Sequence, residues 1–131
     1  IRDRQEAIPR LGEDEACRVV VITGSGRAFS AGGDVKAMVP GGAWNMTPKD
    51  CEERLRSLHA VAIALHALPK PTISMVNGVA AGAGCNLAMA CDVRVASDSA
   101  KFGLAFRNVG LADDMGGAWL LPRLFLNVKA L

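Results

Sequence analysis

Residues 78–92, "GVAAGAGCNLAMACD", place a run of glycine and alanine between a strand-like and a helix-like segment. Small residues let another group approach the backbone, and the first N–H groups of a helix are free to bind an anion. A Walker phosphate loop requires Lys and then Ser or Thr after its last glycine, where this chain has Cys85 and Asn86. A dinucleotide fingerprint requires a third glycine that "GAGCNL" lacks. The turn therefore matches neither kind of phosphate site.

A second turn of the same kind lies upstream. Residues 30–34, "SAGGD", and residues 80–84, "AAGAG", each follow a strand-like segment and lead into a helix-like one. Two such turns can aim two backbone N–H groups at one point, which stabilises a developing oxyanion without a metal. We therefore expect the anion to be one that forms during a reaction.

Strand-like and helix-like segments alternate along the chain, which predicts an α/β fold. Short apolar runs predict three strands, the first of them buried: 18–23, 72–76 and 93–97. Helical spacing and caps predict three helices: 48–68, 82–90 and 116–124. Thr47 is the predicted N-cap of the first helix, and Asp34 the cap of a further short helix. Residues 39–46, which include Trp44, are a candidate mobile loop that either contacts a ligand or covers the core.

The composition favours one globular domain over residues 1–131, with 50% hydrophobic and 21% charged residues. A formal net charge of +2 with scattered basic residues argues against a nucleic-acid partner. The longest apolar run, "AVAIALHAL", is too short to cross a membrane, and the charged N-terminus lacks a signal-peptide pattern. The cysteines show no C-x-x-C spacing, so we expect reduced thiols and a cytoplasmic or organelle-matrix protein. His59 and His66 lie on one predicted helix without a third ligand, so no metal site is predicted.

Three segments carry a resemblance to a known family: 26–38 "GRAFSAGGDVKAM", 70–97 "KPTISMVNGVAAGAGCNLAMACDVRVAS" and 102–124 "FGLAFRNVGLADDMGGAWLLPRL". In this order they resemble successive signatures of the crotonase superfamily, the enoyl-CoA hydratase/isomerase family. The resemblance implies a partial crotonase-like spiral of β-β-α units. It also implies a core that lacks the first strands and the C-terminal helices, and a homotrimer or homohexamer for the full-length protein.

The resemblance further implies an acyl-CoA thioester as substrate, with CoA as part of the substrate and no other cofactor. The thioester oxygen is expected between the N–H groups of Ala31 and Ala83. Family members often have glycine where Ala83 stands, but alanine supplies the same N–H. The stretch from Ala31 through Gly32, Gly33 and Asp34 to Val35 resembles the part that holds the adenine end of CoA. Asp34 itself is read as a helix cap rather than a catalyst.

The acid–base residues decide the reaction. By resemblance, the two glutamates of a typical hydratase correspond here to Asn86 and Phe106, both expected to contact substrate. "GLADDMGG" resembles the turn of family isomerases in which an aspartate moves a proton, and Asp114 stands at that position. Apolar neighbours would raise the pKa of its carboxyl toward that of a useful base.

The resemblance thus favours a double-bond isomerase with Asp114 as acid and base. Three alternatives stay open. Asp114 could instead cap the helix that starts near Met115, the protein could be a hydratase in which Asp114 and Asn86 activate water, or it could bind CoA without catalysis. Asp113 is expected to be a solvated neighbour of Asp114 or a helix cap.

Overall fold

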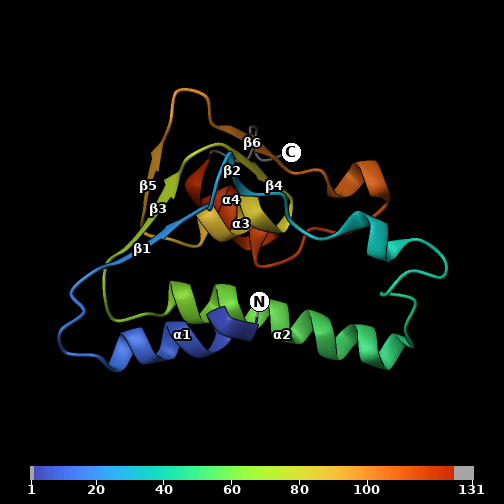
Figure 1. The fold of residues 1–131 in the computed structure, drawn as a ribbon, viewed down its shortest axis with the longest axis horizontal. Coiled ribbons are helices and arrows are strands. Elements are labelled where there is room, and N and C mark those ends of the chain that lie inside the picture. Colours follow the sequence, from blue (N-terminus) through green and yellow to red (C-terminus); the bar gives the residue numbers. More distant parts are fainter. Residues whose placement is uncertain (1, 126–131) are drawn as a thin grey trace.

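Two short strands followed by a helix form a unit that occurs three times within residues 2–125, the part of the chain that the computed structural model describes (Figure 1). A helix, α1 (Arg2–Glu13), precedes these units. The bounds of the units are β1 (Val20–Thr23), β2 (Ala28–Ser30) and α2 (Pro48–His66); β3 (Thr72–Val76), β4 (Val79–Ala81) and α3 (Ala83–Met89); β5 (Val93–Ala96), β6 (Lys101–Gly103) and α4 (Gly117–Leu124). Short 3₁₀ helices cover Val35–Met38 and Phe106–Val109. The predicted spiral of β-β-α units is confirmed.

Each unit gives one strand to each of two parallel sheets. The first strands form the order β1-β3-β5, with Val20 opposite Thr72 and Ile73 opposite Val93. The second strands form the order β2-β4-β6, with Ser30 opposite Ala80. Because neighbouring strands run parallel, their carboxyl ends lie at the same edge, and the turns after β2 and β4 leave the sheet side by side.

The sequence predicts the three helices within two residues at each end, and the expected caps of α2 and of the short helix at 35–38 are confirmed. Thr47 Oγ1 accepts a hydrogen bond from Asp50 N at 3.2 Å, and Pro48 is the first residue of α2. Asp34 Oδ1 accepts from Lys36 N at 3.0 Å and caps the 3₁₀ helix at 35–38. These side chains satisfy backbone N–H groups that have no partner inside the helix.

The expectation about the first strand is wrong in two respects. β1 begins at Val20 rather than at Arg18, and it is buried on one face only, because Val21 is 51% exposed. Ala28–Ser30 forms β2, the strand before the turn at 30–34, for which the sequence gives no bounds. Strands of three residues are too short to show an alternating pattern, so only their partners in the sheet reveal them.

The core surrounds α3. Every residue of α3 from Gly84 to Met89 is buried, and the cluster around it includes Leu65 of α2 and Leu120 of α4. α1 and α2 lie side by side as a layer below the sheets (Figure 1). Cys85 and Cys91 are buried in this core, and burial raises the pKa of the Cys91 thiol to about 11. No helix between residues 2 and 125 is both long and apolar enough to cross a lipid bilayer.

Candidate active site

The turns after β2 and β4 are in contact, and two glycines make the contact possible. Gly32 has φ +82°, and a Cβ there would lie 2.6 Å from Ala81 O and 3.4 Å from Ala83 N. A Cβ on Gly84 would lie 2.5 Å from Ser30 Cβ. The distances of 2.6 Å to Ala81 O and 2.5 Å to Ser30 Cβ are shorter than a Cβ tolerates, so only glycine lets the two turns approach this closely. The expected meeting of "SAGGD" with "AAGAG" is therefore present.

Both turns leave a backbone donor without a partner. Gly82 caps α3 with φ 51°, and its own N–H is bonded to Gly103 O at 2.8 Å. Ala83 is the first residue of α3, where an N–H has no acceptor inside the helix. Ala31 follows the last residue of β2. Neither the Ala31 N–H nor the Ala83 N–H has a hydrogen-bond partner among residues 2–125.

A cavity of about 930 Å³ lies against these turns, which is a volume typical of a site for a small molecule. It is lined by most of the residues that the sequence singles out: Ala31, Gly32, Gly33, Asp34, Val35, Ala83, Phe106 and Asp114. Leu58 and Val61 of α2, together with Met115, make the wall largely apolar. Trp44 also lines the cavity, half-buried, with the Arg54 guanidinium 4.2 Å above its ring.

Asp114 is a half-buried carboxyl on the cavity wall, next to Asp113, which is also half-buried and lines the cavity, and Asp114 does not cap α4. The N-cap of α4 is Gly116, without a side-chain cap bond, and Asp114 contributes only its carbonyl, to Gly117 N at 3.0 Å. The Oδ1 atom of Asp114 is buried without a hydrogen-bond partner among the described residues. Burial raises the pKa of this carboxyl and the charge of Asp113 raises it further, while His59 and the Asn86 amide oppose the shift. The cap interpretation is wrong, and the expected rise in pKa is confirmed in direction.

Asn86 lies behind the cavity wall rather than in it. Its side chain is fully buried, and Nδ2 donates to Asp113 Oδ1 at 2.6 Å and to Asp114 O at 2.8 Å. Asp113 caps no helix, so the capping alternative for it is wrong; its half-buried carboxylate accepts the Asn86 bond. Gly117 leaves the space for the pair, since a Cβ there would overlap both side chains. Asn86 therefore positions the turn that carries Asp114, and the structure does not bring it to the place where substrate contact is expected.

His59 is a member of the cavity wall that the sequence analysis does not include. It lies on α2 next to the buried Leu58, and its Nε2 is buried without a hydrogen-bond partner within residues 2–125. His66 does not share the cavity; its ring meets Trp119 edge-on at 5.3 Å. The position of His59 between Leu58 and Ala62, on the inward edge of an amphipathic helix, is the signal that could have revealed it. Within the described part of the chain no group of three or more His, Cys, Asp and Glu could hold a metal ion.

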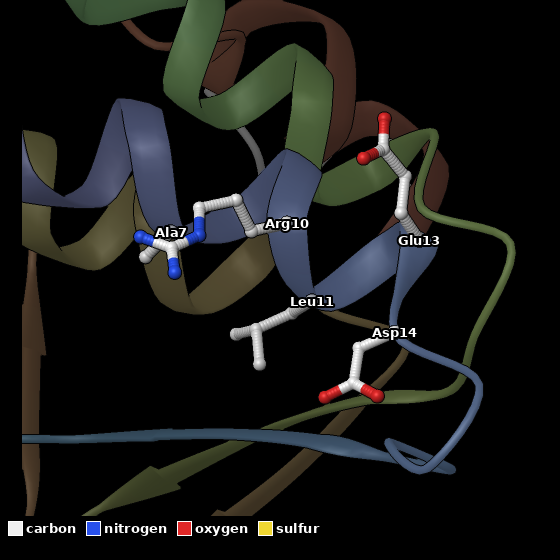
Figure 2. A pocket seen from close by; sticks show the side chains of 5 residues that line it. All are labelled: Ala7, Arg10, Leu11, Glu13 and Asp14. Carbon is white, nitrogen blue, oxygen red and sulfur yellow. The ribbon is translucent and has the colours of Figure 1, made fainter.

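A second depression, beside the end of α1, has a different character. Figure 2 shows its lining residues Ala7, Arg10, Leu11, Glu13 and Asp14, with the two carboxylates pointing in different directions. Lys70 Nζ closes the end of α1 by donating to Leu11 O and Asp14 O, at 2.6 and 2.5 Å. Lys70 therefore stabilises the helix end, and the two carboxylates do not point toward a common site.

Comparison with known proteins gives one family model and several relatives that match most of this chain. Residues 1–130 match the family model described as enoyl-CoA hydratase/isomerase. The chain is 40% identical to the 1,2-epoxyphenylacetyl-CoA isomerase of Escherichia coli, over 96% of this chain and 48% of that protein. It is 37% identical to 4-chlorobenzoyl coenzyme A dehalogenase-1 of Arthrobacter, over 91% of this chain and 43% of that protein.

A solved structure of an enoyl-CoA hydratase also resembles this chain. The crystal structure of an enoyl-CoA hydratase from Polaromonas superposes with a TM-score of 0.89 at 36% identity, over 97% of this chain and 49% of that one. The chain thus spans about half the length of the proteins it matches. Their names describe three different reactions, each on a compound of coenzyme A.

Proposed function

The chain belongs to the enoyl-CoA hydratase/isomerase family, and from this premise we propose that the whole protein moves a double bond within an acyl-CoA thioester. The thioester oxygen binds to the N–H groups of Ala31 and Ala83, and Asp114 carries the proton. Coenzyme A is part of the substrate, and the reaction uses no other cofactor. The turn from Ala31 to Val35 holds the adenine end of CoA, with Asp34 as the cap of its short helix.

The proton balance needs only one carboxylate. Asp114 takes a proton from a carbon next to the thioester or next to the double bond, and negative charge develops on the thioester oxygen. Two preorganised N–H groups stabilise that charge in a water-poor site. Asp114 then returns the proton to a different carbon, so that the double bond has moved and the carboxylate is restored.

The observation that carries this proposal is the burial of the Asp114 carboxyl and its lack of a hydrogen-bond partner at Oδ1. The residue lines the cavity, its Oδ1 atom is buried without a partner among the described residues, and burial raises the pKa of the carboxyl. A carboxylate that is weakly solvated and unpaired is a stronger base than one in water. An isomerase of an acyl-CoA compound is among the relatives, at 40% identity, beside a dehalogenase at 37% and probable hydratases at 41% and 45%.

A hydratase finds less support in this cavity, because adding water requires a second group that exchanges protons. Phe106 is apolar, and the Asn86 amide is bound to Asp113 and Asp114. An amide does not exchange a proton at neutral pH. A CoA-binding protein without catalysis has no use for an unpaired, half-buried carboxyl, which costs stability.

The test is an assay of the full-length protein on 2-enoyl-CoA and 3-enoyl-CoA esters. Double-bond migration and water addition are followed separately, by proton NMR in deuterated water. We expect migration with deuterium incorporated into the acyl chain, and much slower formation of 3-hydroxyacyl-CoA. Efficient hydration without migration would show that the protein is a hydratase and not an isomerase. Tight binding of both esters without either reaction would show that it binds CoA esters without catalysis.

A further inference from the structure

We propose that Arg54 binds a carboxylate at the far end of the acyl group, so that the site selects CoA thioesters of dicarboxylic acids over those of plain fatty acids. This inference rests on the proposed function, because it takes the cavity for the site of the acyl group. It names a class of substrate and adds a recognition residue that takes no part in the proton transfer.

Arg54 is the cation of the cavity wall. From α2 the wall receives six residues: Cys51, Arg54, Leu55, Leu58, His59 and Val61. Among the described residues no other arginine and no lysine lines the cavity, and Arg54 itself is exposed. The acidic side chains of the wall, those of Asp34, Asp113 and Asp114, repel an anion. A negatively charged substituent of the acyl group is therefore attracted to the wall at Arg54 and repelled where the proton transfer takes place.

The guanidinium of Arg54 is held in place without being neutralised. Its Cζ atom lies 4.2 Å from the centre of the Trp44 ring, which lines the same cavity. Asp50, one turn earlier on α2, accepts a hydrogen bond from the Thr47 hydroxyl at 2.7 Å instead of pairing with Arg54. Within residues 2–125 the ion pair on this helix joins Arg56 to Glu52, and Arg54 forms none. The planar set of N–H groups that an arginine offers to a carboxylate is thus available to a ligand.

The place of Arg54 on α2 fits the far end of an acyl chain. Leu58 lies one turn after Arg54 on the same face of the helix, is buried and lines the cavity. Ala83, whose N–H is proposed to bind the thioester oxygen, begins α3 in the centre of the molecule. The first turns of α2 and the loop before it lie at one side (Figure 1). A chain that starts at Ala83 and follows the hydrocarbon wall past Leu58 therefore reaches Arg54 last.

The experiment compares two acyl-CoA esters of equal chain length, one ending in a carboxylate and one in a methyl group, at several chain lengths. Both carry the same CoA phosphates, so the comparison reports the acyl group alone. Calorimetry gives the dissociation constants for the full-length protein, and proton NMR follows double-bond migration. We expect the carboxylate-ended ester to bind roughly five- to fiftyfold more tightly at the best length, between the values for an exposed ion pair and a charge-assisted hydrogen bond. Equal affinity at every length overturns the proposal.

Three variants assign the preference to Arg54. Arg54→Gln removes the charge and should lose the preference through weaker binding of the carboxylate-ended ester alone. Arg54→Lys keeps the charge without the planar fork and should retain part of the preference. Arg56→Gln is the matched control, because Arg56 is an exposed arginine of the same helix that lies outside the cavity. It should leave the preference unchanged.

The remaining outcomes separate this proposal from its alternatives. A preference that survives in Arg54→Gln, or that Arg56→Gln removes as well, overturns the role of Arg54. Equal weakening of both esters in Arg54→Gln also overturns it, because the anion at Arg54 is then a phosphate of CoA. A preference that depends on Arg54, in a protein that shows no double-bond migration, supports the carboxylate site and overturns the isomerase instead.

Discussion

Asn86 Nδ2 donates a hydrogen bond to Asp113 Oδ1 over 2.6 Å, and this contact ties the turn before α4 to the centre of α3. The same amide nitrogen reaches Asp114 O at 2.8 Å. One buried side chain therefore fixes the backbone on both sides of the Asp113–Asp114 peptide, and so the direction in which the Asp114 carboxyl points. Asn86 acts on the proposed reaction by positioning Asp114 rather than by touching substrate.

Asp114→Asn should abolish most of the double-bond migration and leave the fold intact. The amide is isosteric with the carboxyl but does not exchange a proton at neutral pH. Loss of a general base lowers the rate by roughly a hundred- to ten-thousandfold. Exchange of acyl protons with deuterated water reports the proton step, and calorimetry reports whether the ester still binds. Near-normal exchange in this variant would mean that another residue carries the proton.

Asp113→Asn is the matched control, because it changes the neighbouring carboxyl to the same amide. Asn at 113 can turn its carbonyl oxygen toward Asn86 Nδ2 and keep that hydrogen bond in neutral form. Removing the charge of Asp113 also lowers the pKa of Asp114 toward its ordinary value. We expect proton exchange within about tenfold of the wild-type rate, since one hydrogen bond weakens without being lost. An equal loss of proton exchange in both variants would show that the base has been assigned to the wrong aspartate.

Asn86→Leu should destabilise the protein and slow the reaction together. Leucine has a similar volume, but the substitution removes the Asn86 donor from the Asp113 carboxylate and leaves Asp114 O with Gly117 N alone. A polar group left unpaired by such a change costs about 1–3 kcal/mol. Urea unfolding measures that cost, and kcat measures the loss of positioning at a temperature where the variant is folded. An unchanged unfolding free energy would contradict the role given to Asn86.

Gly32→Ala should cost more stability than Gly41→Ala, although both glycines have nearly the same backbone angle. Their φ values are +82° and +81°, so a left-handed alanine is strained to the same degree at each position, by about 1 kcal/mol. The difference is the contact at Gly32, where a Cβ meets Ala81 O, while nothing lies within 4 Å of a Cβ on Gly41.

Binding provides a second readout for this pair. Gly32→Ala forces the turn after β2 away from the turn after β4 and moves the Ala31 N–H relative to the Ala83 N–H. We expect weaker binding of acyl-CoA and a lower kcat in Gly32→Ala, and nearly wild-type values in Gly41→Ala. Thermal unfolding and calorimetry on the two variants make the comparison. Equal effects in both would show that the contact between the turns is unimportant.

The sequence predicted the parts of the fold that depend on local chemistry. Thr47, Pro48 and Asp34 signal their helix ends because capping is a property of a few neighbouring residues. The two glycine-containing turns are visible for the same reason, because only glycine tolerates the close approach at positions 32 and 84. Asp114 was found through its resemblance to a family turn, and not from local chemistry.

Contacts between segments that lie far apart in the chain could not be predicted from the sequence. The bond between Asn86 and Asp113 joins residues 27 positions apart, and nothing in either segment specifies the other. Asn86 consequently looked like a substrate contact, and Asp113 looked like a solvated neighbour or a helix cap. His59 was set aside with His66 as one of a pair, because helical spacing cannot tell which histidine faces a cavity that other segments build.

As pH rises, ionisation of Asp114 should increase the activity of the protein and decrease the stability of its fold. The raised pKa means that Asp114 is still protonated in the folded protein at pH values where an ordinary aspartate, with a pKa of about 3.9, is already ionised. Proton abstraction requires the carboxylate, so kcat should rise with pH through this raised pKa and level off above it. Asp113→Asn should shift that rise to lower pH, because a neighbouring negative charge is removed.

Stability follows from proton counting. Between the ordinary pKa of aspartate and the raised pKa of Asp114, the folded protein binds more protons at this site than the unfolded chain does. Its contribution to the unfolding free energy therefore falls as pH rises through that window and stays low above it. Asp92, whose pKa is lowered mainly by hydrogen bonds from Thr72, has the opposite dependence. Urea unfolding of the wild-type protein and of Asp114→Asn at matched pH values cancels the Asp92 contribution in the difference. We expect Asp114→Asn to gain stability relative to the wild-type protein as pH rises through the window, and a constant difference would contradict the burial of the Asp114 carboxyl.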